Sequence, residues 1–98
     1  MALDNAKKEK TKAKLERDAT LMKFVASQFH KLDDSKEFYE CSALRFEFEG
    51  NWKEAGLSYL NRELGIEGER KAANIYWQQK MFKEFSLIKD AAKEAHGV

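Results

Sequence analysis

The sequence has no proline, only one cysteine and only five glycines among its 98 residues. Because proline and glycine are the residues that most often interrupt helices, their scarcity predicts long helices. The single Cys41 cannot form a disulfide within the chain, so we expect a packed thiol and a reducing, cytoplasmic location. No apolar run approaches the roughly 18 residues that span a bilayer, and no apolar segment follows the N-terminal lysines, so we expect no membrane association and no export.

The residues that carry catalysis are also sparse. The two histidines lie in different segments, no serine has a histidine at a motif spacing, and no glycine-rich phosphate loop is present. A metal site of His30 with Asp33, Asp34 and Glu37 is an alternative, but these acidic residues are better explained as the stop of one helix and the cap of the next. We therefore predict no enzyme activity, no catalytic residues, no metal site and no cofactor.

The residues that are present predict an all-α fold. Apolar side chains recur at spacings of three and four, which indicates a small bundle of four helices over 15–32, 36–49, 52–64 and 69–95. A break near residues 80–83, where MFKEF loosely echoes NWKEA, would make five helices, although no glycine or proline enforces it. Residues 15–98 are predicted to form one helical domain. Residues 1–14 are basic and have no large apolar side chain between positions 4 and 14, so we expect a disordered or frayed helical extension.

The centre of the predicted bundle is a hairpin of two helices that turns at Gly50–Asn51. Asp34 and Glu37 fit a capping box at the start of the first helix, and Gly65 is suited to a left-handed conformation at the end of the second, with Ile66 folding over the last turn. The first helix is apolar on two sides, so it is covered by neighbouring helices on both sides or leaves one side for a partner.

A strand is the competing interpretation for the end of the first helix. Leu44, Phe46 and Phe48 alternate with charged residues, as in a half-buried strand. The segment after the turn has helical spacing and cannot supply the partner strand. We therefore keep a helix over 36–49.

The hairpin places a bulky, a small and an aromatic residue on its first helix, a Gly-Asn turn, and a small and an aromatic residue on its second helix: Tyr39, Ala43, Phe46, Gly50, Asn51, Ala55 and Tyr59. This pattern resembles a single tetratricopeptide repeat over residues 39–64. It departs from that family at Arg62, where a second small residue is usual, and in having no proline after the second helix. The resemblance implies a helical hairpin, but the family's peptide-binding groove cannot be carried over to named residues, because such grooves need several stacked repeats.

Aromatic residues exceed what one apolar stripe per helix requires, and aromatic side chains are enriched at the cores of protein interfaces. We therefore expect a protein-interaction module (an adaptor, assembly factor or inhibitor) that docks on a larger protein, and self-association is a further option. The candidate binding residues are Phe46, Phe48, Trp52, Tyr76, Trp77 and Phe82.

Nucleic-acid binding is the alternative function. Residues 1–31 carry eight Lys or Arg against four Asp or Glu, whereas residues 32–67 carry four against nine. The basic segment favours contact with phosphates, and the acidic middle opposes it. The candidate residues are Lys7, Lys8, Lys10, Lys12 and Lys14. A third hypothesis joins the two: an inhibitor or recruiter of a nucleic-acid-processing enzyme, docked by the hairpin, with the lysines near the nucleic acid.

Overall fold

The computed structural model describes residues 1–95, with side chains up to residue 93. It contains six α-helices and one short 3₁₀ helix: α1 (Ala2–Glu16), α2 (Ala19–Lys31), α3 (Ser35–Glu49), α4 (Trp52–Tyr59), η1 (Arg62–Leu64), α5 (Gly65–Gln78) and α6 (Phe82–Ala95). No strand occurs within this described part of the chain. The predicted all-α class is confirmed, but the described residues form six α-helices and not four or five.

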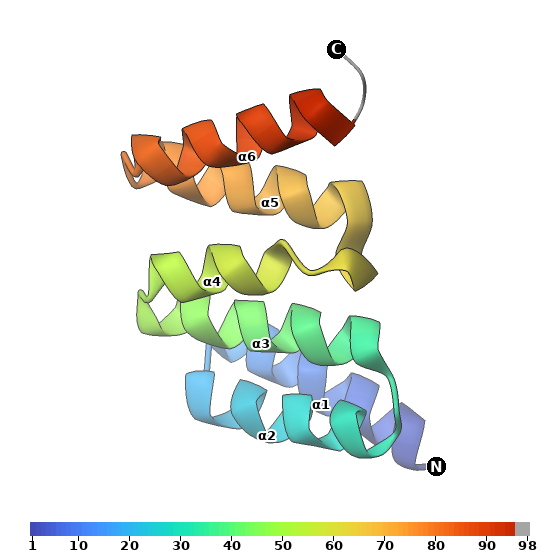
Figure 1. Ribbon diagram of the computed structural model, residues 1–98. Coiled ribbons are helices and arrows are strands. Elements are labelled where there is room, and N and C mark those ends of the chain that lie inside the picture. Colours follow the sequence, from blue (N-terminus) through green and yellow to red (C-terminus); the bar gives the residue numbers. More distant parts are fainter. Residues whose placement is uncertain (96–98) are drawn as a thin grey trace.

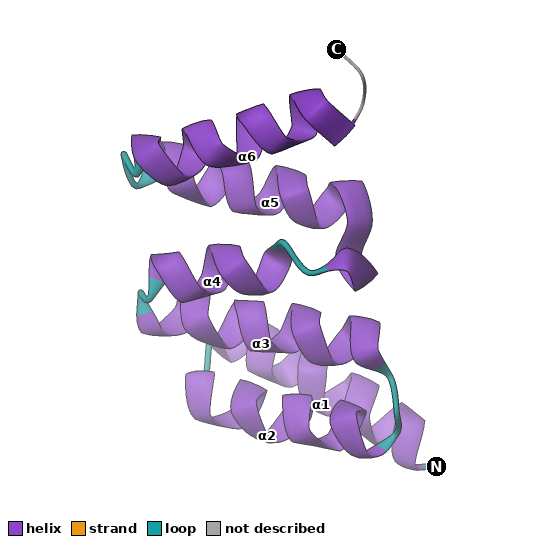
Figure 2. Cartoon of the chain, viewed as in Figure 1, coloured by secondary structure: helices purple, strands orange, loops and turns teal. Residues whose placement is uncertain are grey.

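The helices form an elongated stack in which each one packs on its neighbours in sequence (Figure 1). The stack measures 45 × 26 × 16 Å. Helices α1 and α2 lie at one end of it, and α6 lies at the other end. Short turns and loops join the helices, as Figure 2 shows, so consecutive helices run in roughly opposite directions. Within the described residues, α6 packs mainly on α5 and therefore lies at the end of the stack.

The central helix α3 separates two hydrophobic clusters. Cys41 of α3 packs into a cluster with the buried residues of α1 and α2, and Ala43 packs into a second cluster with those of α4 and α5. The two apolar sides of α3 are thus both covered by neighbouring helices, which is one of the two arrangements that the sequence left open. The buried members of the second cluster are Ala43, Ala55, Tyr59, Ala72, Ile75 and Tyr76.

Asp34 caps α3 as predicted, but the capping box is incomplete: the Asp34 N–H donates to the Phe29 carbonyl at 3.0 Å, and the Glu37 carboxylate accepts from Lys10. The Asp34 carboxylate accepts a hydrogen bond of 3.2 Å from the backbone N–H of Glu37 at the N-terminus. At the C-terminus Gly50 has φ +74°, a left-handed conformation that costs glycine little. The competing strand over residues 44–49 is wrong, because this segment lies inside α3.

The predicted helix over 15–32 is wrong at its N-terminal end. Helix α1 ends at Glu16, Arg17 is left-handed with φ +51°, and α2 begins at Ala19. The Asp18 carboxylate accepts from the Leu21 N–H at 3.0 Å and caps α2. Leu15, the first residue of the predicted stripe, is consequently exposed.

The predicted helix over 52–64 is shorter in the structure. Helix α4 ends at Tyr59, and Asn61 caps η1 by accepting from the Glu63 N–H at 3.0 Å. Gly65 has a positive φ of +57°, but its ψ of −147° is not left-handed helical, and it opens α5 directly. Ile66, expected to fold over the preceding turn, is exposed.

The predicted long helix over 69–95 is divided into α5 and α6. The break is the one left open near residues 80–83: Lys80 has φ +60°, and the Met81 N–H donates to the Tyr76 carbonyl at 2.7 Å. This left-handed residue reverses the chain so that α6 packs back on α5. Residues 96–98, which complete the predicted domain 15–98, lie outside the described residues.

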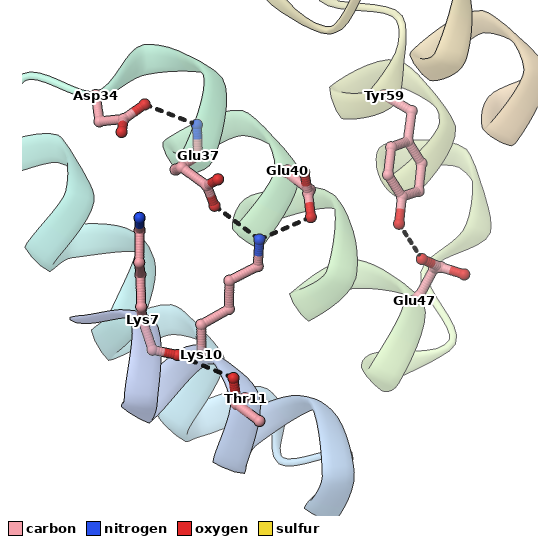
Figure 3. A network of polar contacts seen from close by, with 8 residues as sticks. All are labelled: Lys7, Lys10, Thr11, Asp34, Glu37, Glu40, Glu47 and Tyr59. Carbon is pink, nitrogen blue, oxygen red and sulfur yellow. Dashed lines mark hydrogen bonds and ion pairs between the residues drawn. The ribbon is translucent and has the colours of Figure 1, made fainter. Parts of the chain in front are cut away.

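The N-terminal segment, expected to be disordered or frayed, is the packed helix α1 in this structure. Its buried residues are Ala6 and Ala13, whose small side chains let α1 lie close against α2. Lys10 reaches across to α3, where its Nζ donates to the carboxylates of Glu37 at 2.7 Å and Glu40 at 2.8 Å (Figure 3). Two alanines and one bridging lysine thus hold a helix that has no large apolar side chain facing the core.

The environment of this bridge shifts two pKa values. Burial alone would lower the pKa of Lys10, but the hydrogen bonds and charges of the two glutamates outweigh burial and raise it above the ordinary value. Burial alone would raise the pKa of Glu40, but the hydrogen bond and charge of Lys10 outweigh burial and lower it. Both shifts favour the charged pair.

Candidate interaction surface

Four of the six predicted aromatic binding residues are wholly or partly buried. Tyr76 lies in the second cluster, and Phe46 and Trp52 pack against it. Phe48 packs against the first cluster. Phe46 and Phe48 are further covered by the guanidinium groups of Arg45 and Arg17, at 4.1 and 5.0 Å from the respective ring centroids.

The other two predicted residues, Trp77 and Phe82, are exposed at the turn between α5 and α6. Their relative exposures are 57% and 52%. The Trp77 ring contacts Phe82 edge to face with centroids 5.5 Å apart, and it contacts Phe85 at 5.1 Å. The structure thus brings these three rings together on the C-terminal half of the stack, away from the 36–64 hairpin.

On the same half of the stack, α4 and α6 flank an apolar groove of about 270 Å³ that Glu69 and Tyr76 of α5 also line. Leu57 on α4 and Leu87 on α6 form its exposed edges, with relative exposures of 51% and 62%. The charged residues among its described lining are the carboxylates Glu69 and Glu84. The full described lining is Leu57, Leu60, Glu69, Tyr76, Glu84, Leu87, Ile88 and Ala91. We call this the α4–α6 groove.

A second hollow, of about 280 Å³, lies on the opposite edge of α6. Ile88 and Glu69 line both hollows, so the α6 helix separates them. Arg70 and Lys89 give the second hollow positive as well as negative charge. The α4–α6 groove is therefore the more acidic of the two.

Tyr76 forms part of the floor of the α4–α6 groove, and two contacts with α4 hold it in place. Its ring lies against Gly56 of α4, and its hydroxyl donates to the Lys53 carbonyl at 2.9 Å. Burial raises the pKa of Tyr76, and the charges of Glu84 and Glu54 raise it further. The hydroxyl therefore stays neutral at physiological pH, and the field around it is negative.

The five predicted nucleic-acid-binding lysines do not act as one group in this structure. Lys10 is engaged by Glu37 and Glu40, whereas the others are exposed on α1. At about 100° per residue, Lys7 and Lys14 share one side of the helix, and Lys8 and Lys12 lie on another. The exposed members are Lys7, Lys8, Lys12 and Lys14.

Other surfaces of the described chain offer less to a ligand. A hollow of about 450 Å³ lies between Leu3 of α1, the α2–α3 turn and Glu63 of η1, and its lining is mostly charged or polar. No group of three or more His, Cys, Asp or Glu side chains in residues 1–93 is arranged to hold a metal ion. None of the helices that the structure describes has the length and apolar character needed to cross a bilayer.

Of the residues that form the α4–α6 groove, Tyr76 was predicted as a binding residue, but the two exposed edges, Leu57 and Leu87, were not. Leu57 lies off the apolar stripe of residues 52–64, and Leu87 lies off the stripe of residues 69–95. The sequence does show that both leucines lie beside the main apolar stripe of a helix. It does not show which residue of another helix each of them faces. Comparisons with protein-family models, with curated proteins and with solved structures find no match to this chain.

Proposed function

We propose that this protein is a protein-interaction module, acting as an adaptor, assembly factor or inhibitor, that docks on a larger protein through its C-terminal half. The observation that carries the proposal is the set of exposed apolar side chains on α4, α5 and α6. Three of them line the two hollows beside α6, and the other two, Trp77 and Phe82, contact each other. We call this set the C-terminal apolar face: Leu57, Ile66, Trp77, Phe82 and Leu87.

These side chains leave apolar surface in water on one half of the stack. Exposed apolar residues also occur at the other end, for example Leu15 and Phe24, but these line none of the described hollows, whereas Leu57, Ile66 and Leu87 do. Burying apolar surface is worth about 25 cal/mol per Å², and contiguous patches of it typically mark interaction sites. Trp77 and Phe82 are of the type that anchors interfaces.

The stack itself supports a scaffold role. Three successive helical hairpins, α1–α2, α3–α4 and α5–α6, expose long side surfaces (Figure 1). This succession agrees with the proposed likeness of residues 39–64 to a tetratricopeptide repeat, a family whose repeats stack in such a way. With its single cysteine buried and unpaired, the protein is proposed to work in the reducing cytoplasm.

The test compares two double variants that each remove one exposed leucine and one exposed ring. One is Trp77→Ser with Leu87→Gln on the C-terminal apolar face, and the matched control is Phe24→Ser with Leu15→Gln at the other end. Tagged chains are used for affinity capture from the source cells, and circular dichroism checks that each variant is folded. A specific partner should be captured by wild type and control and lost with the first variant.

Two results contradict the proposal: capture of the same proteins by both variants, or loss with the control alone. Trp52→Ala and removal of residues 1–14 are weaker probes. Trp52 packs against the second cluster, and α1 covers part of the first, so either change also threatens the fold.

Nucleic-acid binding through α1 stays the alternative, because four of its five lysines are exposed. Replacing Lys7, Lys8, Lys12 and Lys14 by glutamine leaves the Lys10 bridge intact and removes four charges. A mobility shift of labelled duplex at low salt that this variant abolishes would favour the alternative, and with it a role beside a nucleic-acid-processing enzyme. No shift with wild type would exclude it.

A further inference from the structure

We infer that the α4–α6 groove receives one amphipathic helix of the partner protein, with its apolar face inserted between Leu57 and Leu87 and with lysine or arginine on its flanks. This inference rests on the proposed function and specifies the chemistry of the partner. It follows from the groove's size, the state of its backbone and its charge.

The size of the groove favours side chains over a cofactor. Its volume of about 270 Å³ is close to the lower limit of the roughly 300–1,000 Å³ typical of small-molecule sites. It is open, with Leu57 and Leu87 at its edges and Tyr76 and Ile88 deeper in it. Such a groove accepts a few apolar anchors presented from one side.

The backbone around the groove favours a helix over an extended peptide. Helices α4, α5 and α6 satisfy their inner N–H and C=O groups within themselves, so they offer no free sheet edge for an added strand. Binding must therefore come from side chains, and a helix presents anchors at positions i, i+3, i+4 and i+7 along one face. Helices α2, α3, α4 and α5 each pack against two neighbouring helices, whereas α6 packs mainly against α5. A helix bound in the groove would be the second neighbour of α6.

The charge of the groove selects a basic helix. Glu69 and Glu84 line it, and no lysine or arginine does so among the described residues. Glu54 on α4 adds to the negative field felt by Tyr76. A second copy of this chain, bound groove to groove about a two-fold axis, would bring these carboxylates toward one another, so charge disfavours it.

The test titrates the full chain with three labelled synthetic peptides and follows fluorescence anisotropy. The first carries leucines at i, i+3, i+4 and i+7 with flanking lysines, the second has glutamate in place of every lysine, and the third has the composition of the first in scrambled order. The first should bind, the second about tenfold more weakly, and the third not measurably. A tenfold ratio is the size expected for exchanging two rim ion pairs for like-charge contacts.

Substitutions locate the binding. Leu57→Gln and Leu87→Gln should each weaken the lysine peptide about tenfold, since each removes one exposed edge of the groove. The matched control Leu15→Gln, at the far end of the stack, should leave its affinity unchanged. Glu69→Gln together with Glu84→Gln should bring the affinities of the lysine and glutamate peptides together.

Several outcomes overturn the inference. Equal binding of the lysine and glutamate peptides to wild type contradicts the role of the groove's charge. Equal binding of the lysine peptide to wild type and to Leu87→Gln shows that the α4–α6 groove is not the binding site. A dimer in light scattering that Leu87→Gln dissociates makes a second copy the occupant. If no peptide binds but Trp77→Ser with Leu87→Gln still loses a captured partner, this inference fails and the proposed function stands. If that variant also keeps the partner, both fail.

Discussion

Replacing Gly56 by alanine should destabilise the protein, although alanine is normally the better residue inside a helix. Helices α4 and α5 are in close contact here: a Cβ on Gly56 would lie 2.2 Å from Cζ, 2.3 Å from Oη and 2.6 Å from Cε1 of Tyr76. All three distances are well short of ordinary van der Waals contact. The ring is only 2% exposed and is tied by its 2.9 Å hydrogen bond to the Lys53 carbonyl, so it cannot swing aside freely.

The magnitude follows from three terms. Overpacking a well-packed site costs about 1–3 kcal/mol. Displacing the Tyr76 ring from its hydrogen bond costs about 1 kcal/mol more. The higher helix propensity of alanine offsets about 1 kcal/mol. The free energy of unfolding should therefore fall by about 1–3 kcal/mol, which urea denaturation followed by far-UV circular dichroism measures directly.

A double-mutant cycle isolates the cause. In a Tyr76→Leu background the ring tip is absent, so Gly56→Ala should be neutral or stabilise by up to about 1 kcal/mol. The coupling between the two positions should then exceed about 1 kcal/mol. A Gly56→Ala protein as stable as wild type would refute the close approach of α4 and α5. An equal loss in both backgrounds would place the cause elsewhere.

Three further predictions follow from the packing. Gly68→Ala should lower stability in the same urea assay by more than Gly56→Ala, because the new Cβ would lie 2.1 Å from a backbone carbonyl oxygen of α4, which cannot rotate away. Lys10→Met should cost about 1–2 kcal/mol at neutral pH, against at most about 0.5 for the exposed Lys8→Met. Because the pKa of Glu40 is lowered, its share of this stability is present above its ordinary pKa and lost as pH falls through the lowered one, so the difference in stability between wild type and Lys10→Met should shrink as the pH falls below the ordinary glutamate pKa. Burial raises the pKa of Cys41 to about 12, so its alkylation at neutral pH should proceed only as fast as the chain unfolds and should accelerate with urea; fast labelling of the native protein would show that the thiol is accessible.

The helical hairpin could be predicted from sequence because several local signals agree there. Asp34 has a glutamate three residues later, Gly50 supplies the left-handed turn, and small residues recur where α3 and α4 meet. Each signal acts within a few residues, so sequence spacing alone contains it. The same locality explains why the all-α class was predicted correctly.

The break at Arg17 could not be predicted, and the break near residues 80–83 could only be left open, because no glycine or proline marks either position. Arg17 and Lys80 are both left-handed, a conformation that side-chain-bearing residues seldom adopt. Asp18 caps α2 as Asp34 caps α3, but Leu21 stands where a capping box has an acid, so the pattern lacked its second half. Packing on the adjacent helix stabilises these turns, and that contribution is absent from any local pattern.

For the same reason, the candidate binding surface could be predicted only in part from the sequence. Trp77 and Phe82 were predicted from composition, and the structure exposes both beside the α5–α6 turn. The α4–α6 groove exists only because the chain reverses at Lys80: an unbroken helix over 69–95 would carry Leu87 far beyond α4, whereas the reversal brings it to the groove edge opposite Leu57. The left-handed conformation of one lysine therefore places residues of α5 and α6 side by side in the same groove. A substitution that extended α5 as a helix through this turn would remove the groove without replacing any of the residues that line it.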